Sequence, residues 1–99
     1  MTVTHKLIQQ RPSTSVDFFA QNDSTIIDKV EEYKSAGKVI SYDFDGTISE
    51  DTLTKTMTIT FNSEDDFDEY SNDDVLNVGT DARIKHCEDN SISWSVEQA

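Results

Sequence analysis

The sequence predicts an α+β domain in which one antiparallel sheet is covered on one face by two helices. The first observation is a pair of alternating apolar runs within residues 39–61, which indicates a β-hairpin with its turn at Glu50-Asp51. The second is apolar residues at helical spacing before and after that hairpin, over 24–36 and 63–86. Outside these, 2–10 and 92–96 alternate as half-buried strands do. The 99 residues, 1–99, suit a single domain.

The hairpin pattern predicts a specific register. A turn at Glu50-Asp51 places the apolar residues of both arms on one face, where they pair as Ile48 with Leu53, Phe44 with Met57, Tyr42 with Ile59 and Ile40 with Phe61. The other face then pairs Ser41, Asp43, Asp45 and Thr47 with the threonines at 60, 58, 56 and 54. A slip by one residue would exchange the two faces, so we expect this register throughout.

The remaining elements follow from capping and turn residues. The first strand, Thr2 to Gln10, should end at Arg11-Pro12, because proline cannot donate to a sheet. We interpret 13–23 as an ordered loop or short edge strand whose phenylalanines reach the core. The helix over 24–36 has Asp23 or Ser24 as its N-cap and Gly37 as its stop.

A second helix should begin after Ser63, be interrupted at Asn72-Asp73 and continue to about His86. With the last strand over 92–96, the order becomes β-α-β-β-α-β, the ferredoxin-like arrangement of one antiparallel sheet with both helices on one face. The predicted core packs five residues of the sheet against five of the helices. These are Phe44, Met57, Ile59, Phe61 and Trp94 against Ile26, Val30, Tyr33, Phe67 and Val78.

The charge is strongly asymmetric. The net charge is −12, and all of it lies in residues 39–99, since residues 1–38 are neutral in sum. Such a field repels nucleic acid and anionic membranes and favours a protein partner with a basic surface. No apolar run is long enough to span a membrane, and Cys87 has no second cysteine to pair with. We therefore expect a soluble, cytoplasmic protein that uses no cofactor and binds neither nucleic acid nor membrane.

The strand VISYDFDGTIS, residues 39–49, resembles the first motif of haloacid-dehalogenase-type phosphatases. The resemblance implies Asp43 as nucleophile and Asp45 as general acid, with Mg²⁺ bound between the substrate phosphate and the carboxylates. That family places its motif at the end of a parallel strand, whereas here the motif lies inside a hairpin. We therefore predict that Asp43 and Asp45 are not catalytic and that the chain holds no dedicated metal site, although the two carboxylates remain candidates for loose cation binding.

The acidic segment 64–74 is the candidate partner-binding surface. It carries seven acids around Phe67 and Tyr70, which face the core. The residues we assign to it are Glu64, Asp65, Asp68, Glu69, Asp73 and Asp74.

The segments RPSTSVDFF and TFNSEDDFDEY resemble segments of small acidic proteins of tailed bacteriophages. This resemblance implies no activity. It implies that the protein is located in the cytoplasm of the host cell. Our leading hypothesis is a non-enzymatic protein that acts by protein–protein contact and forms a homodimer. One alternative is a small-molecule enzyme or binder like the dimeric α/β-barrel monooxygenases, and a second is an inhibitor that mimics DNA. Because the helix-free face is rich in Ser, Thr and Asp, we expect it to be open to solvent with no enclosed pocket. We expect a dimer to form through a sheet edge or through the VDFFA segment, residues 16–20.

Overall fold

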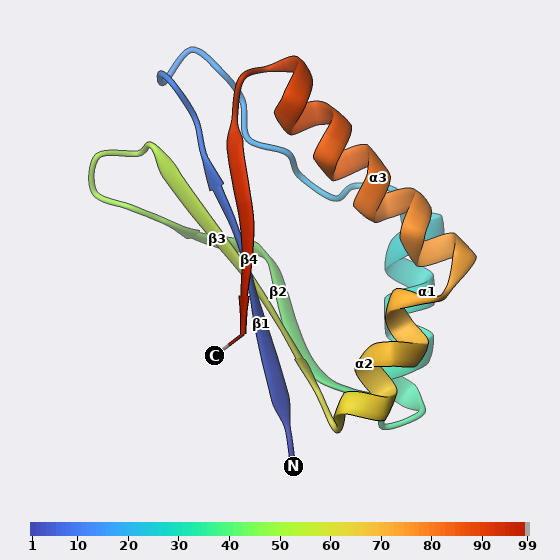
Figure 1. Ribbon diagram of the computed structural model, residues 1–99. Coiled ribbons are helices and arrows are strands. Elements are labelled where there is room, and N and C mark those ends of the chain that lie inside the picture. Colours follow the sequence, from blue (N-terminus) through green and yellow to red (C-terminus); the bar gives the residue numbers. More distant parts are fainter. Residues whose placement is uncertain (99) are drawn as a thin grey trace.

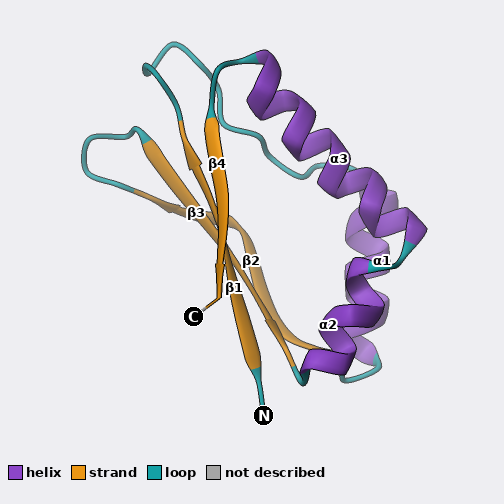
Figure 2. Cartoon of the chain, in the orientation of Figure 1, coloured by secondary structure: helices purple, strands orange, loops and turns teal. Residues whose placement is uncertain are grey.

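A computed structural model describes residues 1–98 as a four-stranded antiparallel sheet with three helices on one face (Figures 1 and 2). The sheet order is β2-β3-β1-β4, which is that of the ferredoxin-like fold, so the predicted fold class is confirmed. The strands are β1 (Val3–Gln10), β2 (Val39–Ile48), β3 (Thr54–Phe61) and β4 (Ser93–Gln98). The helices are α1 (Ser24–Ser35), α2 (Glu64–Ser71) and α3 (Asp74–Asp89). Among the described residues, no helix is both long and apolar enough to cross a membrane.

The helices begin where capping residues stand. Asp23 accepts a hydrogen bond from the Thr25 amide at 2.9 Å, and Ser63 accepts one from the Asp66 amide at 3.2 Å. The predicted interruption at Asn72-Asp73 is present: α2 ends at Ser71, and Asp73 caps α3. The third helix runs three residues further than predicted, to Asp89, and Asn90 is its C-cap.

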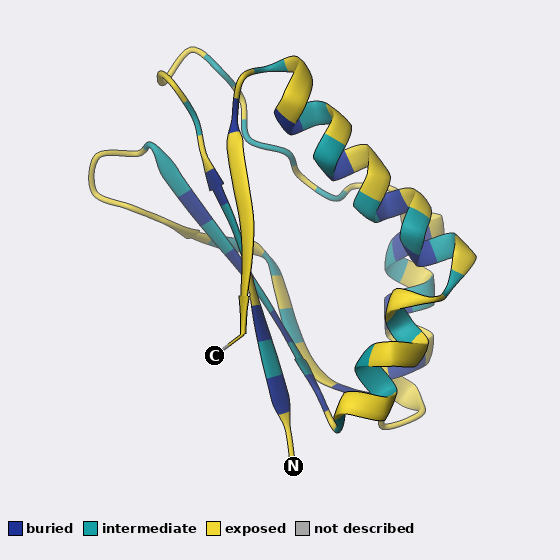
Figure 3. Cartoon of the chain, in the orientation of Figure 1, coloured by how far each residue is buried: buried dark blue, intermediate teal, exposed yellow. Residues whose placement is uncertain are grey.

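The core lies between the helices and the sheet, and its buried residues come from α1, α3, β2 and β3 (Figure 3). Phe61 and Val30 are among its fully buried residues, and Phe67 and Tyr70 pack against it. Two members of the predicted core are wrong, because Trp94 is 40% exposed and Val78 is 61% exposed. Trp94 lies on the edge strand β4, and α3 buries Leu76, Gly79, Arg83 and Cys87 instead of Val78.

The predicted hairpin register holds only in the middle of β2. Ser41, Tyr42 and Asp43 face Thr60, Ile59 and Thr58 as expected. On either side the register shifts: Val39, not Ile40, faces Phe61, while Thr47 faces Thr56 and Ile48 faces Lys55. As a result Ile40 and Ile48 are exposed rather than buried.

The second shift is a bulge around Gly46. Gly46 has φ +70°, and its amide donates to the Asp43 Oδ1 at 2.9 Å. A Cβ at Gly46 would stand 2.5 Å from the Thr56 carbonyl oxygen, so the close approach of β2 to β3 requires glycine. Alternation in the sequence does not reveal a bulge, because the apolar residues keep their spacing along the chain.

The helix-free face of the sheet is polar, as predicted. Its central rows are the threonines of β3, which are half-buried, beside Ser41, Asp43 and Thr47 of β2, which are exposed. Thr4 and Thr60 share a hydrogen bond of 2.9 Å across β1 and β3. No helix covers this face (Figure 1).

Candidate functional site

A pocket of about 360 Å³ lies between the helix-facing side of the sheet and the three helices. The apolar pattern of the sequence predicted a packed core there and no pocket. Residues from every helix and strand, and from the 11–23 segment, line it. From the sheet these are His5, Leu7, Phe44, Met57, Ile59, Phe61 and Val96; from the helices Ile26, Phe67, Tyr70, Ser71, Leu76, Asn77, Gly79, Thr80 and Arg83; and from the segment Phe19 and Gln21.

Gly79 lets α3 pack closely against α1 and the 11–23 segment. A Cβ at Gly79 would lie 2.9 Å from Gln21 Nε2 and 3.0 Å from Ile26 Cγ2, so a larger residue would push α3 away from both. Leu7, although it faces the helices from a central strand, is only half-buried. Val96, beside it on β4, is 44% exposed. The pocket is therefore open to solvent on the side next to the edge strand β4.

Arg83 brings a positive charge into this apolar lining. It is 6% exposed, and its Nη1 has no hydrogen-bond partner within residues 1–98. Its guanidinium carbon lies 5.7 Å from the centre of the Trp94 ring, an attractive cation–π geometry that satisfies none of its donors. Burial lowers the pKa of Arg83, yet a guanidinium stays charged at any physiological pH. A buried guanidinium with a free donor is suited to bind an anion.

His5 is the second buried polar group of the lining. Its ring stacks on Phe67 with centroids 4.2 Å apart and meets Phe61 edge-on at 5.7 Å. It is 9% exposed, and its Nε2 has no hydrogen-bond partner within the described chain. Burial lowers the pKa of His5, and the charge of Glu64 opposes this shift only in part. The imidazole is therefore neutral at pH 7 and offers one unused hydrogen-bonding atom.

The electrostatics of the pocket are opposite to those of the rest of the molecule. The chain has 20 acidic residues, but none of them lines the pocket. The charged side chain in the lining is Arg83. The acids are thus segregated to the outer surface, and the pocket is an apolar space with a single cation.

The upper wall of the pocket is the segment 11–23, held in place by two buried polar side chains. Gln9 accepts from the Phe19 amide at 2.9 Å and donates to the Phe19 carbonyl at 3.3 Å. Lys55 Nζ donates to the same carbonyl at 3.1 Å. Burial lowers the pKa of Lys55, while the nearby Asp45 and Asp43 raise it. These bonds fix Phe19 at the pocket. The prediction that the phenylalanines of this loop reach the core is wrong, because Phe18 and Phe19 are only half-buried outside the core cluster, and Phe18 packs under Arg11 at 4.3 Å instead.

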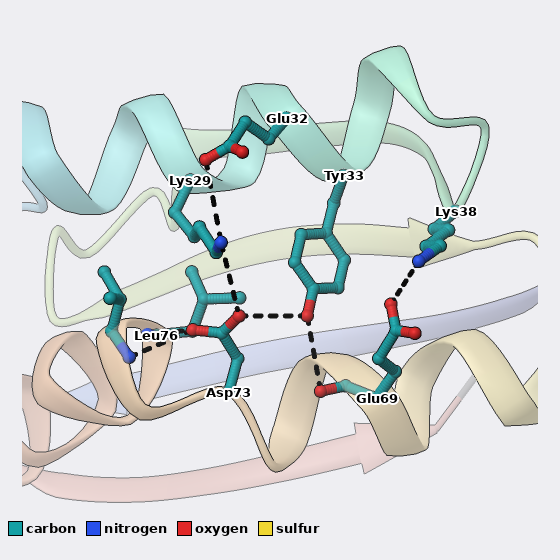
Figure 4. A network of polar contacts seen from close by, with 8 residues as sticks. Lys29, Glu32, Tyr33, Lys38, Glu69, Asp73 and Leu76 are labelled. Carbon is teal, nitrogen blue, oxygen red and sulfur yellow. Dashed lines mark hydrogen bonds and ion pairs between the residues drawn. The ribbon is translucent and has the colours of Figure 1, made fainter.

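The structure divides the predicted partner-binding residues into two groups. Asp73 has a structural role: its Oδ1 accepts from the amides of Val75 (2.9 Å) and Leu76 (3.2 Å), and its Oδ2 from the Tyr33 hydroxyl at 3.1 Å (Figure 4). Glu69 forms an ion pair with Lys38, and Glu64 accepts from Gln98 Nε2 at 3.1 Å. The other predicted residues, Asp65, Asp68 and Asp74, are exposed.

The motif carboxylates are not gathered into a site. Asp43 and Asp45 are exposed on β2, and Asp43 holds the bulge through the Gly46 amide. Within residues 1–98, no group of three or more His, Cys, Asp or Glu residues is arranged to hold a metal ion.

Buried polar residues in apolar rows are the sequence signal for this region. His5, which lines the pocket, and Gln9 and Lys55, which hold Phe19, stand at strand positions where alternation puts the side chain on the helix side. Arg83 follows Leu76 and Gly79 at helical spacing, on the buried stripe of α3. A polar residue in a buried row indicates a functional site more strongly than an exposed acid does, because a buried polar group needs a hydrogen-bond or charge partner.

The chain was compared with known protein families, curated proteins and solved structures, and none of the three comparisons found a match.

Proposed function

We propose that this protein binds a small, largely apolar molecule in the pocket between the sheet and the helices, without catalysing a reaction. The observation that supports this is the unfilled space of about 360 Å³ with two buried, unpaired polar groups in its lining, Arg83 and His5. Ligand pockets are mostly apolar with a few placed polar groups, which is the composition found here. In a well-packed interior, both the space and the unpaired donors would be costly.

Binding is favoured over catalysis by the chemistry of the lining. It has no carboxylate and no thiol, and Cys87 is buried outside it with a pKa raised by burial. Arg83 is a permanent cation and does not exchange protons near pH 7. His5 is the one lining group of the described chain with proton-exchange chemistry near that pH, and no carboxylate lines the pocket to orient its ring as in a general base. The lining can therefore orient a ligand, and we assign it that task.

The test uses N-phenyl-1-naphthylamine, a neutral dye whose fluorescence rises in apolar sites. We expect saturable binding to the wild-type protein. Leu7→Phe places extra volume in the pocket and should weaken dye binding about tenfold or more, since the added ring occupies the space of the ligand. The matched control is Ile8→Phe, the next residue of the same strand, which faces the helix-free side.

Two results would contradict this proposal. One is the absence of dye binding to protein whose circular dichroism shows it to be folded. The other is equal binding by Leu7→Phe and Ile8→Phe, which would place the dye outside the pocket.

A second proposal concerns the exposed acids of α2. Asp65 and Asp68 are exposed in the first and second turns, and residues 39–99 carry the whole net charge of −12. These features support protein–protein contact with a basic partner, of which mimicry of DNA is one form.

Replacing Asp65 and Asp68 by Asn should slow association with a basic protein such as egg-white lysozyme and reduce its salt dependence. The control replaces Asp28 and Glu31, exposed acids of α1, by Asn and Gln. Equal effects of the two pairs would mean that the attraction reflects net charge alone.

A further inference from the structure

We propose that the ligand of the pocket is an amphipathic carboxylate whose anionic group pairs with Arg83; this inference rests on the proposed function and names its ligand class. The apolar part of the ligand then lies over the pocket floor formed by Leu7, Met57 and Ile59.

Arg83 is a buried charge without a partner among the described residues. Its side chain is more than nine-tenths buried, lines the pocket, and keeps Nη1 without a hydrogen-bond partner within residues 1–98. Burying an unpaired charge is among the most costly arrangements in a protein, and such charges are normally paired. All four described ion pairs are made by lysines, so no described acid compensates Arg83.

The guanidinium of Arg83 is best paired by a carboxylate. Its planar donors match a carboxylate in two parallel hydrogen bonds, which are shorter and stronger than bonds between neutral groups. The absence of all 20 acids from the lining leaves this pairing to an external anion. Of the sixteen other lining residues, eleven are apolar or aromatic, and they favour an anion that carries an apolar body.

The pocket is accessible beside the edge strand β4. Trp94, whose ring lies near Arg83, is 40% exposed, and Val96 of the same strand is 44% exposed. A ligand that enters along β4 meets Arg83 beside Trp94 and can place its chain inward. The negative field of the whole protein opposes an anion at a distance, but salt screens this repulsion beyond about 10 Å, whereas the buried contact is screened much less.

The experiment compares each carboxylate with its alcohol by isothermal titration calorimetry. Decanoate and decanol test an aliphatic ligand; 1-naphthaleneacetate and 2-(1-naphthyl)ethanol test an aromatic one. In the wild-type protein the carboxylate of at least one pair should bind roughly ten to a hundred times more tightly than its alcohol. The pair that shows the preference identifies the apolar body.

Arg83→Met should abolish the preference while leaving the alcohol's affinity within about threefold, because methionine keeps the apolar volume without the charge. The matched control is Lys85→Met, which removes an exposed positive charge from the same helix. Arg83→Lys should retain part of the preference and serves if Arg83→Met does not fold.

Equal affinity of acid and alcohol in both pairs would overturn the inference, as would a preference that survives in Arg83→Met. Neutral dye binding without a carboxylate preference would leave the proposed function standing and refute only the ligand class. If the folded wild-type protein binds neither the dye nor any of these four compounds, both the proposed function and the ligand class are refuted.

Discussion

Gln9 and Lys55 face each other across β1 and β3, and both hold the carbonyl of Phe19. Gln9 also accepts a hydrogen bond from the Phe19 amide. Both backbone polar groups of this loop residue are therefore hydrogen-bonded to side chains of the sheet. This arrangement gives the 11–23 segment a fixed position without a strand or helix of its own.

The first prediction concerns Gln9. Gln9→Leu keeps the volume but removes both bonds to Phe19, leaving its amide without a partner. We expect a loss of about 1–3 kcal/mol in the free energy of unfolding, measured in urea. Gln10→Leu, on an exposed neighbour, should be within about 0.5 kcal/mol of wild type. A Gln9→Leu protein as stable as Gln10→Leu would show that the loop is held by other contacts.

The second prediction concerns Asp73, the cap of α3. Asp73→Ala removes the acceptor for two helix amides and for the Tyr33 hydroxyl (Figure 4), and should cost about 2 kcal/mol or more. Asp74→Ala removes an exposed acid one residue later and should cost far less. Thermal unfolding of both variants compares them directly, and equal losses would contradict a capping role.

The third prediction separates the two glycines with positive φ. At Gly37, φ is +78° and no atom lies within 4 Å of an added Cβ, so Gly37→Ala should cost roughly 1–2 kcal/mol from backbone strain alone. At Gly46 the added Cβ also meets the Thr56 carbonyl at 2.5 Å, so Gly46→Ala should cost more, roughly 2–4 kcal/mol. Urea unfolding measures both. If Gly46→Ala costs less than Gly37→Ala, the bulge of β2 is not as tight as described.

The fourth prediction follows from the lowered pKa of His5. In the unfolded chain this group has its ordinary pKa of 6.5, and burial lowers the pKa in the folded state. As pH falls below 6.5, the unfolded state takes up the proton first, so stability falls, by at most about 1.4 kcal/mol per pH unit. The loss stops once pH is below the folded-state pKa.

His5→Phe keeps the aromatic contact with Phe67 and removes the titration. The difference in unfolding free energy between wild type and His5→Phe should therefore shift in favour of the variant between pH 7.5 and pH 5. A difference that stays constant over this range would show that the imidazole is solvated in the folded protein.

The order of helices and strands along the chain and the helix caps could be predicted from the sequence because they depend on local signals. Alternation in 39–61, the caps Asp23 and Ser63, and the break at Asn72-Asp73 each report on a few neighbouring residues. The register of β2 depends on the bulge at Gly46, which places extra residues opposite one partner without changing the apolar pattern.

The pocket could not be predicted for a different reason. It arises from tertiary placement: Gly79 draws α3 toward α1, and the space opens over Leu7 on the sheet. The sequence shows that Arg83 and His5 stand in apolar rows. Whether each has a hydrogen-bond partner depends on residues distant in the chain, which local patterns do not reveal. The high number of acids in 64–74 predicted a partner-binding surface. Three of the predicted residues, Glu64, Glu69 and Asp73, form intramolecular contacts in the structure.

The polar residues in the inner layer also affect how stability varies with temperature. His5, Gln9, Lys55 and Arg83 are buried where a typical domain of this size would place aliphatic side chains. Apolar surface exposed on unfolding raises the heat capacity, and polar surface lowers it. Calorimetry should therefore give a heat-capacity change of unfolding below the roughly 1.2–1.5 kcal/mol/K usual for about 100 residues. A smaller change flattens the stability curve, so this protein should lose stability only gradually on cooling or warming around its optimum.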